Sequence, residues 1–282
     1  MEYFTFLKVE DVFGKVYTQV DNRLSIFKVF YPFAEVTDYS ILLGCSCDTK
    51  DDKKYGWYNL RTSANMKDRV RSVDMDGRFR SQQLDNRSIG GRPMVCYSRI
   101  KAESKGISKI VKGGETCIEI EYGEYPQSVV IDELTIKELE NAYENNKLNK
   151  TGKIYTIDKT NHNNYDTPFE PLTYFEYEYK GNKYIRFEVG YNGEGEELSN
   201  GVIFDEAEIC YIKVEPVRWL VDESADMAVS KKILFAGIKF SDDKRYTGNF
   251  ENTFMKKYLD KYFSSEIIPS KLYEKHDIFH NP

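Results

Sequence analysis

The stretch YFEYEYKGNKYIRFEV, residues 174–189, decides the fold class of this chain. Apolar and charged residues alternate on both sides of Lys180-Gly181-Asn182-Lys183. A period of two residues is typical of a strand with one buried face, and a short turn rich in glycine and asparagine joins antiparallel strands. The stretch therefore predicts a β-hairpin with strands over 174–179 and 184–189.

Further strand signals extend in both directions from this hairpin. Residues 209–221 form a long strand-like run that contains Pro216. Because proline cannot donate a hydrogen bond to a ladder, its presence predicts a sheet edge or a bulge there. Residues 227–234 are expected to pair with this strand, and residues 27–33 and 116–122 are expected to form strands of their own.

Two segments carry the period of a helix. Residues 132–147 place apolar side chains near helical spacing, and a second set follows Asn249, with Asn252 as its expected N-cap. Residues 37–44 predict a single capped helical turn closed by Gly44, and Asp76-Gly77 predicts a hairpin turn. The fold class is therefore α+β, with short antiparallel strands, two main helices and long irregular loops.

The composition is aromatic-rich. Phe, Tyr and Trp make up 15% of the 282 residues, and part of this excess falls at periodic positions that are expected to be core. These positions are Phe27, Phe30, Tyr174, Phe175, Trp219, Phe254, Tyr258 and Phe263.

Charge, apolar runs and cysteine count bear on nucleic-acid binding and on the location of the protein. The formal net charge is −6, which disfavours a general affinity for nucleic acid. The sequence has no apolar run long enough for a membrane span and no secretion signal, and its five cysteines are an odd number. We therefore expect a soluble cytoplasmic protein with reduced thiols.

Residues for catalysis or for a bound cofactor are scarce. Of the three histidines, His162 lies in a polar loop, and His276 and His280 lie near the end of the chain in an expected mobile tail. The glycine-rich loop 190–197 is acidic and would repel phosphate, although its Asn192 and its three glutamates leave a calcium site open. We expect no catalytic residues, no metal and no cofactor.

One segment is locally basic. Nine Lys and Arg residues lie between Arg61 and Arg99, opposed by four aspartates. Two interpretations remain open for this segment, a solvated face with ion pairs and an anion-binding surface.

Two sequence blocks resemble a known family. The first block is Thr37-Asp38-Tyr39-Ser40, then Gly56-Trp57-Tyr58-Asn59-Leu60-Arg61-Thr62-Ser63, Val70 to Val73, Gly77 and Gly91-Arg92-Pro93. The second is Glu121 to Gln127, Glu215 to Val221, Phe250-Glu251-Asn252 and Lys257 to Phe263. These blocks are similar to the closing and opening halves of an uncharacterised Firmicutes domain related to the C-type-lectin-like fold of sulfatase-modifying factors, the formylglycine-generating enzymes.

The two halves stand here in reversed order, which resembles a circular permutation. The resemblance implies one composite domain over 1–282. Its parts are 1–101, a joining loop over 102–114, a second half over 115–268 and the tail over 269–282.

The resemblance also implies a function. It suggests a non-enzymatic binding module that holds a protein, peptide or glycan ligand on loops rich in Tyr and Arg, since such residues dominate recognition surfaces. The candidate contact residues are Trp57, Tyr58, Arg61, Asn65, Arg69, Arg71, Arg78, Phe79, Arg80 and Asn86. Calcium-dependent sugar binding is not implied, because Glu215-Pro216-Val217 has valine where that motif of the fold has an amide.

Two other functions stay open. One is an oxidoreductase like the formylglycine-generating enzymes, which would use Cys45 and Cys47. The other is an inhibitor of a host enzyme, encoded by a phage or a mobile element, with which the acidic balance is compatible.

Overall fold

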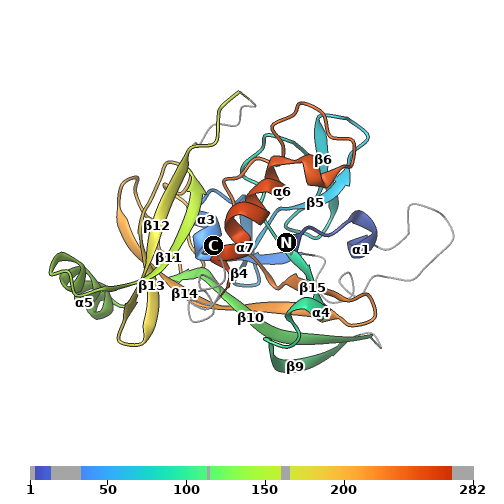
Figure 1. Ribbon diagram of the computed structural model, residues 1–282. Helices are drawn as coiled ribbons and strands as arrows, with labels where there is room; N and C mark the ends of the chain where they lie inside the picture. Colours follow the sequence, from blue (N-terminus) through green and yellow to red (C-terminus); the bar gives the residue numbers. More distant parts are fainter. Residues whose placement is uncertain (1–3, 14–32, 113–114, 160–165, 269–282) are drawn as a thin grey trace, which may run out of the picture.

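The computed structural model describes residues 4–13, 33–112, 115–159 and 166–268 (Figure 1). These residues form a mixed α and β structure in which most strands are antiparallel and the helices are few and short. This arrangement is compatible with the α+β class that the sequence predicts. None of the helices in the described ranges is long and apolar enough to cross a membrane.

The largest sheet has nine strands. They run in the order β1-β8-β15-β14-β13-β12-β11, and β10 pairs with both β14 and β9. Their bounds are β1 Phe4–Thr5, β8 Met94–Cys96, β9 Lys105–Lys112, β10 Glu115–Val129, β11 Asn149–Asp158, β12 Pro171–Tyr179, β13 Asn182–Glu188, β14 Ile209–Asp222 and β15 Met227–Ser230. The predicted hairpin is confirmed as β12 and β13, with Tyr179 opposite Asn182.

Pro216 lies where the sheet is locally incomplete. On one edge of β14, pairing with β13 ends at Lys213 and pairing with β15 begins only at Trp219. On the other edge, β10 shifts its register between Glu121 and Glu124, which faces Pro216. The predicted edge and bulge are therefore both present, because the missing N–H of proline is tolerated only at such positions.

Two smaller sheets and short helices complete the N-terminal part. One sheet contains β16 Lys232–Ile233, β2 Ala34–Val36, β4 Lys53–Gly56 and β3 Cys47–Lys50; the other contains β5 Tyr58–Ser63, β6 Arg69–Val73 and β7 Phe79–Gln83. The helices here are α1 Val9–Phe13, α3 Asp38–Leu42 and α4 Tyr97–Ile100. The predicted turn at 37–44 is confirmed as α3, which is capped by the Thr37 hydroxyl and followed by Gly44 at a φ of 85°.

Both longer helices are found where the sequence predicts them. Helix α5 spans Glu133–Glu144, is capped by Asp132 and lies beside the β12–β13 end of the large sheet (Figure 1). The second is continuous over α6 Phe254–Tyr258, the π-helical turn η2 Leu259–Phe263 and α7 Ser264–Glu266. Its N-cap is Thr253 rather than Asn252, because Asn252 belongs to the preceding 3-10 turn η1 Phe250–Asn252.

The expected joining loop over 102–114 is wrong for most of its length. Residues 105–112 form β9, which pairs with β10 in an antiparallel hairpin. Gly106, which suggested a linker, lies opposite Ile120 beside a register shift. A glycine at a bulge and a glycine in a linker look alike in sequence, because both positions need only a permissive backbone.

The core is built largely from aromatic rings. Trp219 is 0% exposed, and Tyr39 packs edge-on against Tyr125 and Phe187 at ring centroid distances of 5.9 and 5.8 Å. Phe175 is a wrong core prediction, since it is 43% exposed, with the Lys150 ammonium 3.7 Å above its ring. The expected strand over 27–33 lies outside the described residues except for Phe33, so Phe27 and Phe30 do too.

Candidate functional site

Three of the sequence-predicted contact residues meet on the sheet of β5, β6 and β7. The Arg71 guanidinium lies 4.5 Å above the ring of Phe79, and its Nη2 donates to Asn65 Oδ1 at 3.0 Å. Arg69 shares a face with Arg71, because residues two apart on a strand point the same way. We call Asn65, Arg69, Arg71 and Phe79 the arginine face.

Two arginines beside this face are already neutralised. Arg80 Nε lies 2.8 Å from Asp74 Oδ2, and Arg78 Nη1 lies 3.4 Å from Asp76 Oδ2. The Asp74 carboxylate also accepts from the backbone N–H groups of Asp76 and Arg78, which closes the turn between β6 and β7. This part of the basic segment therefore fits the interpretation of a solvated face with ion pairs.

The arginine face itself fits the other interpretation. In the described part of the chain, neither Arg69 nor Arg71 forms an ion pair with a carboxylate. The Nε atom of Arg69 is shielded from solvent and has no hydrogen-bond partner among those residues. A guanidinium stays charged at any ordinary pH and matches the two oxygens of a carboxylate. These side chains can therefore bind an anionic group.

Besides Arg78 and Arg80, four predicted residues lie outside the arginine face. Tyr58 is 1% exposed and lies under the Arg92 guanidinium, 5.0 Å from its ring centroid, so it belongs to the core. Trp57 is half-buried, Asn86 donates to Gln82 Oε1 at 3.3 Å, and Arg61 lines a separate hollow with α1 and η1. Sequence spacing alone could not separate these positions. It shows which side chains share a face of a strand, but tertiary packing decides which face is buried.

The two clustered cysteines are protonated at neutral pH. Burial raises the pKa of Cys45 well above its ordinary value and raises that of Cys47 to about 11. A thiol acts as a nucleophile or metal ligand through its thiolate form. Both side chains are free thiols in the structure, and no observation favours the oxidoreductase hypothesis.

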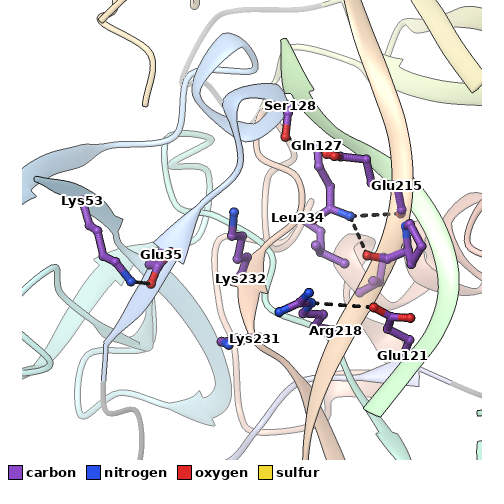
Figure 2. Close-up of a pocket in the computed structure, with 12 residues that line it drawn as sticks. Glu35, Lys53, Glu121, Gln127, Ser128, Glu215, Arg218, Lys231, Lys232 and Leu234 are labelled. Atoms are coloured by element: carbon purple, nitrogen blue, oxygen red, sulfur yellow. Dashed lines mark hydrogen bonds and ion pairs between the residues drawn. The ribbon is translucent and has the colours of Figure 1, made fainter. Parts of the chain in front are cut away.

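A polar cleft that the sequence did not predict lies between the large sheet and the sheet of β2 and β4 (Figure 2). Gln127 fills the gap at Pro216 by donating to the carbonyls of Glu215 and Pro216, both at 3.0 Å. Most charged residues of the cleft form ion pairs, as Lys53 of β4 does with Glu35 of β2 at 2.6 Å on one wall. The only early signal for this cleft was the proline in a long strand.

A buried acid behind the cleft, Glu119, holds two of the cations that line it. The Glu119 carboxylate accepts from Lys231 Nζ at 3.1 Å through both oxygens and lies 3.3 Å from Arg218 Nη1. Arg218 also approaches Glu121 at 3.8 Å (Figure 2). Because its own side chains satisfy most of these charges, the cleft is a weaker candidate for ligand binding than the arginine face.

Metal-binding residues do not come together in the described ranges. No group of three or more His, Cys, Asp or Glu side chains there is placed to hold a metal ion. In the loop considered for calcium, Glu197 instead pairs with Lys54 at 3.1 Å. His162, His276 and His280 lie outside the described residues.

Comparison with known proteins gives no relative. No protein-family model, curated protein or solved structure matches the chain. The resemblance to a C-type-lectin-like domain, and the circular permutation that it implies, therefore stay predictions from the sequence.

Proposed function

We propose that the protein is a non-enzymatic binding module that recognises a protein, peptide or glycan partner through the arginine face, on a C-type-lectin-like scaffold. The observation that carries the proposal is the Arg71 guanidinium, which lies 4.5 Å above the Phe79 ring and has no carboxylate partner among the described residues. Arginine and aromatic residues together dominate the energetics of recognition surfaces.

The charges on the arginine face define the chemistry of the partner. Arg69 and Arg71 offer two guanidinium groups that form no ion pair with any residue the structure describes, and the ring of Phe79 offers an apolar surface beside them. A carboxylate can accept two parallel hydrogen bonds from one guanidinium. The partner is therefore an acidic segment or an acidic glycan that carries at least one carboxylate.

The geometry favours binding at a low entropic cost. Arg71 is held from two sides, by the ring of Phe79 and by the Asn65 carbonyl oxygen at 3.0 Å. A side chain that is fixed before binding loses less rotamer freedom when the partner arrives. The neighbouring turn is also fixed, because Asp74 accepts hydrogen bonds from the backbone N–H groups of Asp76 and Arg78.

An array experiment tests this proposal. The purified protein is applied to an array of Asp- and Glu-rich peptides, their Asn and Gln counterparts, and neutral and uronate-bearing glycans. We expect binding to carboxylate-bearing probes only, and its loss in Arg71→Ala. Lys109→Ala is the matched control, because it removes one exposed positive charge from β9, far from β6 (Figure 1).

Two results would contradict the proposal. One is an array on which acidic probes bind no better than their amide counterparts. The other is acidic binding that Arg71→Ala and Lys109→Ala weaken equally, since that would show a response to overall charge and not to the arginine face.

A further inference from the structure

A further hollow lies where β11, β12 and β13 of the large sheet meet α3. It has a volume of about 420 Å³ and is formed by α3, by β11 to β13 and by two following loops. We call it the aromatic pocket. The lining residues that matter here are Asp158, Tyr174, Phe187, Glu188, Tyr191 and Glu206.

The aromatic walls of the pocket are held in place before any ligand binds. Tyr174 and Phe187 pack with ring centroids 4.7 Å apart, and the Tyr174 hydroxyl donates to the Glu188 carbonyl at 3.3 Å. Phe187 is backed by the buried Tyr39. Tyr191, in contrast, is 62% exposed at the pocket, so one ring remains available to a ligand.

The charge of the pocket is negative. Glu206 forms no ion pair within the described part of the chain. The one cationic residue among its lining, Lys159, pairs with Glu170 at 3.6 Å. Asp158 lies deeper, with its Oδ2 3.4 Å from Arg87 Nε. Glu188 contributes its backbone carbonyl to the Tyr174 hydroxyl, and its side chain lies on the face of β13 opposite Phe187. Glu206 is therefore the acid of the lining that is left without a cation.

We propose that the aromatic pocket binds a small organic cation, an ammonium or guanidinium group attached to an apolar ring or chain. Aromatic faces attract cations through their quadrupole, and the unpaired Glu206 carboxylate adds a direct attraction. An anion would be repelled, and a neutral apolar ligand would leave the Glu206 carboxylate without a role. A volume of about 420 Å³ falls within the range of small-molecule sites.

This site is separate from the arginine face, because the two share no residue and prefer ligands of opposite charge. The cation could be a free amine or the side chain of a lysine or arginine in a peptide. Both sources present the same chemistry to Tyr191 and Glu206.

A matched pair of ligands tests the proposal. At pH 7, 2-phenylethylamine is a cation and 2-phenylethanol is its neutral counterpart with the same ring and chain. In an NMR titration of the full chain, we expect the amine to bind saturably and the alcohol to bind at least about tenfold more weakly. A capped lysine and a lysine-containing tripeptide are then compared. Tighter binding of the tripeptide indicates a peptide source, and tighter binding of the capped lysine indicates a free amine.

Variants place the binding at the pocket. We expect Glu206→Gln and Tyr191→Ala each to weaken amine binding severalfold, while Glu194→Gln, in the same acidic loop but outside the pocket lining, leaves it unchanged. All three residues are exposed, and thermal unfolding of each variant checks that the fold is retained. Equal binding of amine and alcohol, or equal effects of Glu206→Gln and Glu194→Gln, would overturn the proposal.

Discussion

The arginine face and the aromatic pocket differ in charge and in the way the chain assembles them. The face comes from residues 65–79, on two strands joined by one turn, whereas the pocket collects side chains from positions as far apart as 42 and 237. Within the described residues, the face presents two guanidinium groups without ion pairs, and the pocket presents the Glu206 carboxylate without an ion pair. A net charge of −6 hides this local separation, so surface charge has to be compared region by region.

The two regions also differ in what supports them. Phe187 at the pocket packs on Tyr39, Tyr39 on Tyr125, and the Tyr125 hydroxyl donates to the buried Glu266 carboxylate at 3.3 Å. The arginine face depends instead on contacts at the surface of a three-stranded sheet. Substitutions in the core should therefore affect the pocket first, and substitutions in the β6–β7 turn should affect the face first.

Tyr39→Ala is expected to have the largest effect. Tyr39 is 0% exposed and joins the rings of Phe187 and Tyr125, so its removal leaves a cavity that should cost about 3–5 kcal/mol in the free energy of unfolding. Urea denaturation measures this cost. In the folded fraction, amine binding at the pocket should fall while binding of acidic probes at the face remains.

Tyr39→Phe is the control for this substitution. The Tyr39 hydroxyl is buried and has no hydrogen-bond partner among the described residues, so its deletion should be neutral or stabilising. If Tyr39→Phe destabilised the protein as much as Tyr39→Ala, the ring contacts would not be what holds the pocket.

Stability should fall as the pH rises from about 4.5 to about 8. Burial raises the pKa of Glu266 from 4.5 to about 8, so the folded state keeps a proton that the unfolded state releases over this range. Each pKa unit corresponds to about 1.4 kcal/mol, which makes the loss a few kcal/mol. Urea denaturation at several pH values measures it, and Glu266→Gln should remove most of the slope.

Lys153 should reverse the trend at higher pH. Burial lowers its pKa from 10.5 to about 8, so the cost of burying its charge is fully present below pH 8 and is relieved as the pH rises from 8 to 10.5. An unchanged slope in Glu266→Gln between pH 4.5 and 8 would contradict this account of the core under the pocket.

A smaller loss is expected from Asp74→Ala, which acts on the face. Asp74 accepts from the N–H groups of Asp76 and Arg78 and pairs with Arg80, so removing it should cost about 2 kcal/mol in the free energy of unfolding. Acidic probes should bind more weakly, and the amine should bind as before. Asp76→Ala, which breaks only two exposed ion pairs, with Arg78 and Lys50, should cost under about 0.5 kcal/mol.

The smallest expected effect is that of salt. Raising the ionic strength to about 0.5 M shortens the electrostatic screening length below its value of about 10 Å at 0.1 M. The binding of acidic probes at the exposed face should therefore weaken severalfold. The amine, partly enclosed by aromatic walls, should lose less affinity. Equal salt dependence, measured by calorimetry at both sites, would remove the distinction between an open face and an enclosed pocket.

The sequence predicted the elements whose signals are local. The hairpin around Gly181, helix α5 and the break at Pro216 each follow from a few neighbouring residues, and Trp219 was correctly expected in the core. Strand β9 was missed because its residues pair across the sheet with β10, which a period along the chain does not report.

The candidate site was predictable only in part. The basic segment between Arg61 and Arg99 indicated the arginine face, but the burial of Tyr58 under Arg92 depends on tertiary packing. The aromatic pocket had no signal in the sequence, since the alternation places Tyr174 and Phe187 at ordinary strand positions. Glu206 and Tyr191 become part of a site only when the loops after β13 bring them beside these rings.

The most direct test of the binding-module account is the affinity of a capped tetraglutamate peptide, measured by calorimetry at low salt against the wild type, Arg71→Ala and Lys109→Ala. We predict that the peptide binds the wild type and Lys109→Ala with similar affinity and binds Arg71→Ala severalfold more weakly, while a tetraglutamine peptide binds none of them. Equal affinity of tetraglutamate for all three proteins, or no binding to the wild type, would contradict the account.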